Sequence, residues 1–146
     1  MNVPVFLRGE TVTLRPVDES HLDFLLEVLN DRDVWSSLMT VEPTTRTEER
    51  EWIENAGDDG GVHLVIYADG DPVGTIGFDE PNETWGTAEL GYFVDPAAQG
   101  NGYATDAVRR LVRYGFEDRR LHKVYANVYE TNEASMAVLE TVGFER

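Results

Sequence analysis

Several segments of the chain alternate apolar and polar residues with a period of two or are rich in β-branched and aromatic residues, which is typical of strands. These segments cover residues 10–15, 62–68, 72–78, 87–94 and 123–128. Asp69-Gly70-Asp71 separates the second segment from the third and is a hairpin signal, and a polar loop is expected from Asp79 to Trp85. The pattern therefore predicts five strands, two of them joined as a hairpin.

Four other segments repeat apolar residues every three or four positions, as a helix with one buried face does. The third of them joins two predicted strands, so those strands are expected to run parallel as a βαβ unit. Capping and stop signals set the bounds. The helices are expected from Ser20 as the cap to Asn30, from Thr47 to Gly57, from Tyr103 to Phe116, and from Asn132 as the cap to Gly143.

The length of 146 residues fits one domain, expected over 1–146. No apolar run approaches the roughly 20 residues of a membrane span, and no basic segment followed by an apolar one opens the chain, so a cytoplasmic address is expected. The absence of cysteine excludes disulfides, thiolate metal sites and a cysteine nucleophile. Three scattered histidines do not suggest a metal cluster.

Acidic residues outnumber basic ones, 28 to 12, and Lys123 is the only lysine. A surface of this charge argues against a nucleic-acid partner. It would favour cationic substrates such as amines, but it is also the halophilic composition that a salt-rich cytoplasm selects. We prefer the second explanation, since at molar salt the Debye length falls to roughly 3 Å and long-range steering is screened.

A glycine-rich turn, residues 99–104, lies between a predicted strand and a predicted helix. Glycines leave room for a phosphate, and the first amides of a helix have no intrahelical partner, so the turn can bind an anion. The chain has no Gly-Lys-Ser/Thr loop for a nucleoside triphosphate and no dinucleotide fingerprint in the required setting. From these residues alone, an anion site and a plain structural turn remain equally open.

The sequence resembles the GCN5-related N-acetyltransferase (GNAT) superfamily, and within it the RimJ/RimL-type branch. The family's pyrophosphate motif, Gln/Arg-x-x-Gly-x-Gly/Ala, is met in full, and matching segments cover nearly the whole chain in the family's order. The resemblance implies an α/β (α+β) GNAT fold, a central mixed, mostly antiparallel sheet flanked by helices. The matching residues are Gln99, Gly102 and Ala104 of the motif, Leu14 to Pro16, Glu89 to Val94, Asn132 to Ser135, and Gly143-Phe144.

The same resemblance implies acetyl-CoA as co-substrate, no metal, and an amine acceptor, either a protein amino terminus or a small molecule. Backbone groups of Phe93 and Val94 would pair with the pantetheine arm as an added strand does. Asn132 would bond the pantetheine, although a plain helix cap explains it equally well locally. The amides expected to hold the pyrophosphate are those of Gln99, Gly100, Asn101, Gly102, Tyr103 and Ala104.

Transfer requires a neutral amine, whereas an alkyl amine is mostly protonated near pH 7. Glu89 is the candidate base, and an exposed or paired strand carboxylate is the equally weighted alternative. Many family members carry a tyrosine as the acid four residues before the terminal Gly-Phe, where this chain has Leu139. Ser135 is the replacement that the resemblance suggests, Tyr129 is second, and unassisted loss of the thiol is a third possibility.

The family usually continues into two further strands after the Gly-Phe pair, and this chain stops at Arg146. We therefore expect those two strands to be missing. We also expect either a truncation at the carboxyl end or another copy that covers the exposed strand edge in a homo-oligomer. An impaired acyl-CoA-binding domain and a transferase for another acyl group remain alternative functions. Trp35, Met39 and Trp52 lie where the acceptor site is expected, either as its floor or as core residues, and we prefer the core.

Overall fold

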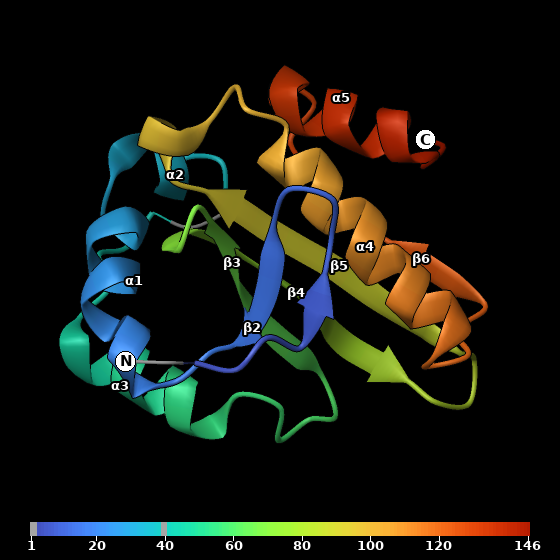
Figure 1. Cartoon of the computed structure of the whole chain (residues 1–146), viewed down its shortest axis with the longest axis horizontal. Helices are drawn as coiled ribbons and strands as arrows, with labels where there is room; N and C mark the ends of the chain where they lie inside the picture. Colours follow the sequence, from blue (N-terminus) through green and yellow to red (C-terminus); the bar gives the residue numbers. More distant parts are fainter. Residues whose placement is uncertain (1–2, 39–40) are drawn as a thin grey trace.

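In residues 3–38 and 41–146, which this computed structural model describes, six strands form one twisted sheet in the order β1-β2-β3-β4-β5-β6 (Figure 1). The strands are β1 (Leu7–Arg8), β2 (Thr13–Pro16), β3 (Val62–Ala68), β4 (Asp71–Asn82), β5 (Thr87–Val94) and β6 (Lys123–Tyr125). The helices are α1 (Leu22–Leu29), α2 (Arg32–Trp35), α3 (Arg46–Asn55), α4 (Tyr103–Glu117) and α5 (Glu133–Val142), with 3-10 turns η1 (Glu19–His21) and η2 (Pro96–Ala98).

The sheet is antiparallel from β1 to β5, and only β5 and β6 run parallel. Helix α4 connects these two strands, so the predicted βαβ unit is confirmed. The predicted hairpin is confirmed as well, since Ala68 of β3 pairs with Asp71 of β4. The chain has the mixed, mostly antiparallel sheet that was expected of it.

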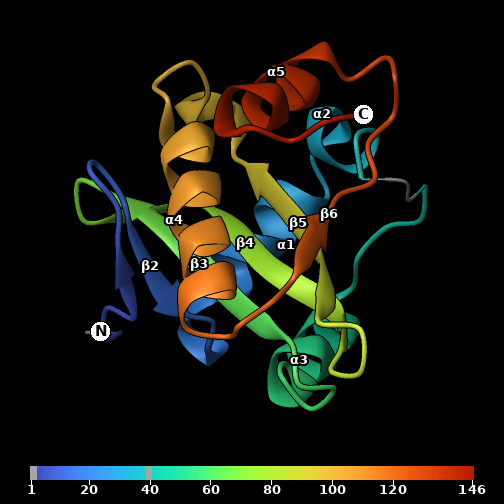
Figure 2. The same ribbon diagram turned by 90° about the vertical axis from the view of Figure 1, so that its right-hand side faces the viewer.

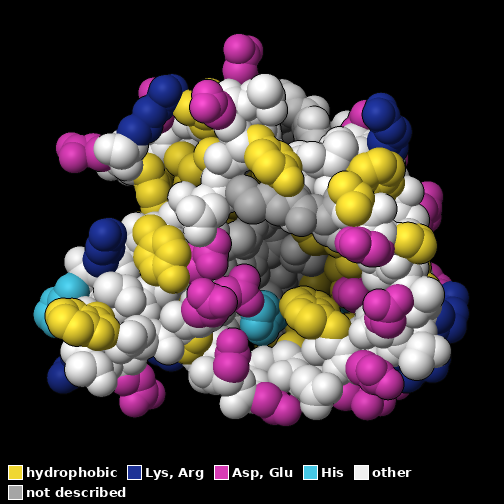
Figure 3. All heavy atoms as spheres, turned by 180° about the vertical axis from the view of Figure 1, so that it is seen from behind, with side chains coloured by type: hydrophobic (Ala, Val, Ile, Leu, Met, Phe, Trp, Pro, Cys, Tyr) yellow, Lys and Arg dark blue, Asp and Glu magenta, His cyan; other side chains and the backbone are white. Residues whose placement is uncertain are grey.

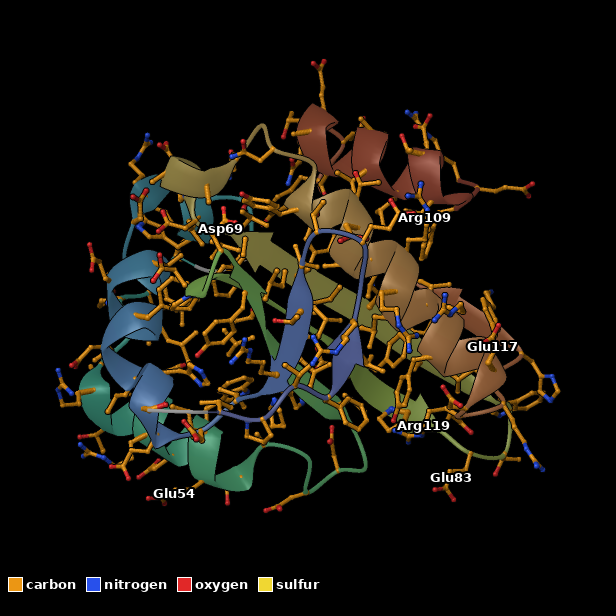
Figure 4. The ribbon with its side chains drawn as sticks, in the orientation of Figure 1. Glu54, Asp69, Glu83, Arg109, Glu117 and Arg119 are labelled. Atoms are coloured by element: carbon orange, nitrogen blue, oxygen red, sulfur yellow. The ribbon has the colours of Figure 1, made fainter. Side chains whose placement is uncertain are left out.

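Helix α4 covers one face of the sheet, and α1, α2 and α3 lie on the other (Figure 2). The main core lies under α4, whose Val108 and Leu111 are fully buried with Ile76 and Phe78 of β4. Helix α5 packs beside α4 through Leu139. Charged side chains such as those of Glu54, Glu83 and Glu117 project outward from this frame (Figure 4).

Three strand predictions need correction. The first strand begins at Thr13 rather than at residue 10, and a two-residue strand, β1, precedes it. Strand β4 continues to Asn82 through residues predicted as a loop. Strand β6 ends at Tyr125 rather than at residue 128, because the chain beyond Tyr125 no longer pairs with β5.

Two helix starts were also placed wrongly. Asp18, not Ser20, caps the first helical turn, because its carboxylate accepts from the amide of Ser20. Thr45 caps α3 two residues before the predicted start, in a capping box with Glu48. Asn132 and Gly143 bound α5 as predicted, the latter in a left-handed conformation at φ +116°.

The first third of the chain contains a short helix, α2, in the segment left irregular by the sequence analysis. Trp52 was assigned to the core, but 39% of its surface is exposed. Trp35 is half-buried, and Met39 lies outside the described residues. The described part of the chain has no helix long and apolar enough to cross a bilayer.

Candidate active site

A cleft of about 590 Å³ opens where β5 and the chain after β6 separate. The two strands pair only from Thr87 to Glu89 of β5, and the residues of β5 from Leu90 onward line the cleft. Residues 126–128, the glycine-rich turn and the start of α5 form the other walls. The cleft is therefore bounded on one side by an unpaired strand edge.

Backbone groups of alternate β5 residues face this edge. The amide of Asp95 donates to the carbonyl of Val73 (2.7 Å), so Asp95 is turned toward β4. Because successive residues of a strand point their backbone groups to opposite sides, Val94 and Tyr92 face the cleft and Phe93 faces β4. Of the two residues expected to pair with pantetheine, Val94 presents its N–H to the cleft, whereas the backbone of Phe93 is used by the sheet.

The glycine-rich turn exposes the amino end of α4. Gly100 and Gly102 adopt φ values of +85° and +79°, a region that glycine enters without a steric penalty, and open space surrounds both at the position of a Cβ atom. Hydrogen bonding of α4 begins with Asp106, whose amide donates to the Gly102 carbonyl (3.1 Å). The amides of Tyr103 and Ala104 therefore have no partner within the helix and are free to bind an anion.

Two polar side chains shape this turn rather than point into the cleft as ligands. The Gln99 side chain donates to the carbonyl of Val94 (3.1 Å). The backbone N–H of Gln99 donates to the carbonyl of Pro96 (3.3 Å). The Asn101 side chain donates to the carbonyl of Ala98 (2.9 Å) and is not part of the cleft wall. The amides available for an anion thus begin at Gly100.

At the other wall, Asn132 and Ser135 open helix α5. The Asn132 side chain accepts from the amide of Ser135 (3.1 Å), so it is a helix cap, and it also lines the cleft. The Ser135 hydroxyl lies 2.7 Å from the hydroxyl of Tyr92, which reaches it from β5. Burial raises the pKa of Tyr92, while its hydrogen bond with Ser135 acts in the opposite direction.

Tyr92 is a cleft residue that the sequence analysis missed. It lies on the face of β5 that carries Leu90 and Val94 into the core, so its pattern indicated only another packed aromatic. A signal was present, since a buried tyrosine hydroxyl requires a hydrogen-bonding partner. The partner is 43 positions away in the sequence.

Glu89 points to the opposite face of β5 from Tyr92, because the two residues are three positions apart in a strand. Its carboxylate accepts from the side chain of Asn127 (2.9 Å) and lines the cleft. Across the sheet, Glu89 pairs with Asp79 of β4. Burial raises the pKa of Asp79, His63 lowers it, and the negative charges of Glu89 and Asp59 raise it further.

A smaller pocket of about 160 Å³ adjoins the cleft, with which it shares Leu38, Gly91, Tyr92 and Phe93. The ring of Trp52 meets His63 edge-on, with 5.1 Å between the ring centres, and His63 lies 3.6 Å from the Asp79 carboxylate. Figure 3 shows acidic side chains gathered beside a hollow on this face of the molecule. The arrangement suits a positively charged group.

The remaining predicted residues lie apart from this site. Tyr129 is 42% exposed and does not line the cleft. Leu139, which stands where the resemblance implies a tyrosine, is buried in the core. Nowhere among residues 3–38 and 41–146 do three histidine, aspartate or glutamate side chains gather to hold a metal ion.

Comparison with known families gives a match over residues 11–145 to the family model described as an acetyltransferase (GNAT) domain. Among curated proteins, the chain is similar to Probable N-acetyltransferase YjcK of Bacillus subtilis (strain 168). The two are 30% identical over 151 aligned positions, which cover 96% of this chain and 83% of that protein.

Two solved structures share the fold. One is spermidine N-acetyltransferase from Vibrio cholerae in complex with CoA and spermine (TM-score 0.86, 24% identity, 94% of this chain and 82% of that one). The other is RimL, a ribosomal-protein alpha-N-acetyltransferase, in complex with coenzyme A (TM-score 0.83, 23% identity, 97% of this chain and 82% of that one).

Proposed function

This chain belongs to the family of GNAT acetyltransferases, and on that premise we propose that it transfers the acetyl group of acetyl-CoA to the primary amine of a small cationic acceptor. The family and its N-acetyltransferase relatives make it an acetyl-CoA-dependent N-acetyltransferase. The observation that carries the choice of acceptor is the pair of neighbouring carboxylates, Asp79 and Glu89, beside the cleft.

The donor half of the cleft fits acetyl-CoA. The amides at the start of α4 and the two left-handed glycines suit the pyrophosphate, and the helix dipole adds perhaps 0.3–1 kcal/mol for a negative charge there. The unpaired edge of β5 supplies the Val94 N–H for the amide-rich pantetheine arm, as in strand addition. Asn132 caps α5 at the opposite wall, and its place in the cleft supports the predicted contact with the same arm.

Glu89 is the residue best placed to take the proton of the acceptor amine. It lines the cleft, and Asn127 fixes its carboxylate without neutralising it. As the amine attacks, negative charge develops on the thioester oxygen, and the backbone N–H of Tyr92, which faces the cleft near Val94, is a donor suited to that charge. With no cysteine in the chain, direct attack replaces a cysteine-bound intermediate.

The acceptor half favours a cation. Asp79 and Glu89 supply negative charge, and Trp52, half-exposed at the pocket, presents an aromatic ring to a cation. The spermidine acetyltransferases among the relatives act on acceptors of this kind. A small diamine is therefore the acceptor class that we expect to react fastest.

The test combines calorimetry of acetyl-CoA binding with release of free coenzyme A thiol. The acceptors are 1,4-diaminobutane, 1-aminobutane, and short peptides with free or blocked amino termini, each assayed at low and at molar salt. The proposal predicts acetyl-CoA binding and fastest thiol release with the diamine. Faster release with a free peptide amino terminus would overturn the acceptor class.

Two further outcomes address the alternative functions. Binding without thiol release from any amine would identify an impaired acyl-CoA-binding domain and refute turnover. Faster reaction with a longer acyl-CoA than with acetyl-CoA would identify a different acyltransferase.

A further inference from the structure

The position at which the family resemblance implies a tyrosine as the acid is filled here by Leu139, which is 6% exposed in the core between α4 and α5. A leucine has no proton to give to a departing thiolate. A different tyrosine, Tyr92, nevertheless brings its hydroxyl into the same cleft, from β5 instead of from α5. Its contact there is with Ser135, at 2.7 Å.

We infer that Tyr92 is a positioning residue for the acid step of the proposed function: it holds the hydroxyl of Ser135 toward the cleft and resupplies its proton. The inference rests on the proposed acetyl transfer. Ser135 is fixed twice, because Asn132 caps its amide and Tyr92 contacts its hydroxyl. When Tyr92 donates this hydrogen bond, the proton of Ser135 is left free to point into the cleft.

The proton balance explains why a serine needs this partner. As the tetrahedral intermediate collapses, the carbon–sulfur bond breaks and the electron pair stays on sulfur as a thiolate. Sulfur takes the proton of Ser135, and the serine oxygen takes the proton of Tyr92, which is restored from solvent. An aliphatic hydroxyl is a much weaker acid than a phenol, whose reference pKa of about 10 lies nearer to the value of about 8.5 for a thiol, and burial raises the pKa of Tyr92 above that reference. Tyr92 therefore brings the donor nearer to the leaving group in acidity.

The opposite faces of β5 separate this step from deprotonation of the amine. Glu89 and Tyr92 project to opposite sides of the strand, so the base lies on the acceptor side, and the paired hydroxyls lie on the side of α5. The proton removed from the amine and the proton given to sulfur thus pass through different groups.

Three variants test the inference in the thiol-release assay, with the amine that reacts fastest with the unaltered chain: Tyr92→Phe, Ser135→Ala and the double variant. We expect Tyr92→Phe to lower kcat about 10-fold, a part of the 10²–10⁴-fold typical of acid–base catalysis, with KM for acetyl-CoA unchanged. In the Ser135→Ala background, Tyr92→Phe should cause no further loss, because both act in one step.

The matched control is Tyr114→Phe, which removes the hydroxyl of a half-buried tyrosine of α4 that packs edge-on against Phe6, outside the cleft. It should leave kcat unchanged. Independent, multiplying losses from the two substitutions, or an effect of Tyr92→Phe on KM alone, would overturn the inference while leaving acetyl transfer intact. Absence of thiol release from the unaltered chain would instead refute the proposed function, and this inference with it.

Discussion

The carboxylate of Asp106, in the first turn of α4, accepts a hydrogen bond from the backbone amide of Thr11 (2.8 Å) in the connection between β1 and β2. The neighbouring amides of Glu10 and Val12 donate to the same carboxylate at 3.0 Å. Asp106 thus turns its negative charge away from the cleft while tying the amino end of α4 to the edge of the sheet.

Replacing Asp106 with alanine should lower stability, because three amide donors lose one ionised acceptor. The expected cost is about 2 kcal/mol, or about 4–8 °C in melting temperature. Asp118→Ala, at the exposed carboxyl end of the same helix, is the control and should change little. Equal effects of the two substitutions in thermal unfolding would show that the hydrogen bonds to Asp106 contribute nothing.

The carboxylate of Asp106 also makes the stability of the fold depend on pH. Burial disfavours the charged form of Asp106, but the amides of Glu10, Thr11 and Val12 outweigh burial and lower its pKa. A lowered carboxyl pKa stabilises the fold above the unfolded value, about 4, and the contribution is lost as the pH falls from there through the folded value. Asp106→Asn should remove this acid-sensitive component from urea unfolding curves.

His21 should make the fold sensitive to pH in a different range. It is 2% exposed, its Nδ1 accepts from the amide of Asp18 (3.0 Å), and its Nε2 lies 2.6 Å from the hydroxyl of Tyr67. Burial lowers the pKa of His21, Asp18 opposes that shift, and Arg15 adds to it. The neutral ring is therefore the form that the fold accommodates.

The stabilisation from neutral His21 is present above the unfolded pKa, about 6.5, and is lost as the pH falls below it through the folded value. Unfolding free energies measured at about pH 8 and about pH 5.5 should decline toward acid, and His21→Gln should flatten that decline. His122→Gln, at an exposed histidine, should retain it. The explanation would fail if both variants behaved alike.

Gly102→Ala should weaken acetyl-CoA binding beyond its effect on stability. Alanine at φ +79° is strained, and its methyl group occupies the space in the glycine-rich turn where the anion is expected to bind. Gly70→Ala is a matched control, because Gly70 has φ +84° in the β3–β4 turn, outside the cleft. Calorimetry should show about 10-fold weaker binding, near 1.4 kcal/mol, for Gly102→Ala only. Similar affinities in the two variants would remove the turn from the binding site.

Glu89→Gln keeps an acceptor for Asn127 but removes the carboxylate that would take the proton of the amine. Turnover should fall about 10²-fold or more, with acetyl-CoA affinity retained. Glu83→Gln, at an outward-pointing acid beyond β4 (Figure 4), changes the net charge equally and should leave turnover unchanged. If both substitutions slowed the reaction alike, the general field of the protein, and not a base at Glu89, would be responsible.

Sequence reasoning succeeded where structure is decided locally. Strand β5 and helix α4 have strong period-two and helical patterns, and their predicted ends differ from the observed ones by at most one residue. Sequence reasoning failed where the existence or the end of a strand depends on pairing with another segment. Strand β1 exists only because Leu7 pairs with Leu14, and β6 stops at Tyr125 because its neighbour is a cleft, although the following residues favour a strand.

In the candidate site, too, the features set by local sequence could be predicted and those set by long-range packing could not. The turn at Gly102 and the cap at Asn132 could be predicted locally, because the reasons for those residue types lie within a few positions. Their roles in binding came from the family resemblance and stay predictions. The contact between Tyr92 and Ser135 could not be predicted, because it depends on how α5 lies over β5. Local patterns also cannot tell that the amide of Gln99 is used inside its own turn.

The unpaired edge of β5 offers a ligand backbone N–H groups, which every residue but proline carries. Side chains along such an edge can change over evolutionary time without altering what the edge offers to a ligand, provided that the strand keeps its register. Substitution scans of this strand will therefore report on packing far more than on coenzyme contact. The need for a donor such as the Val94 N–H constrains the amino-acid sequence in one way, because proline is excluded at that position.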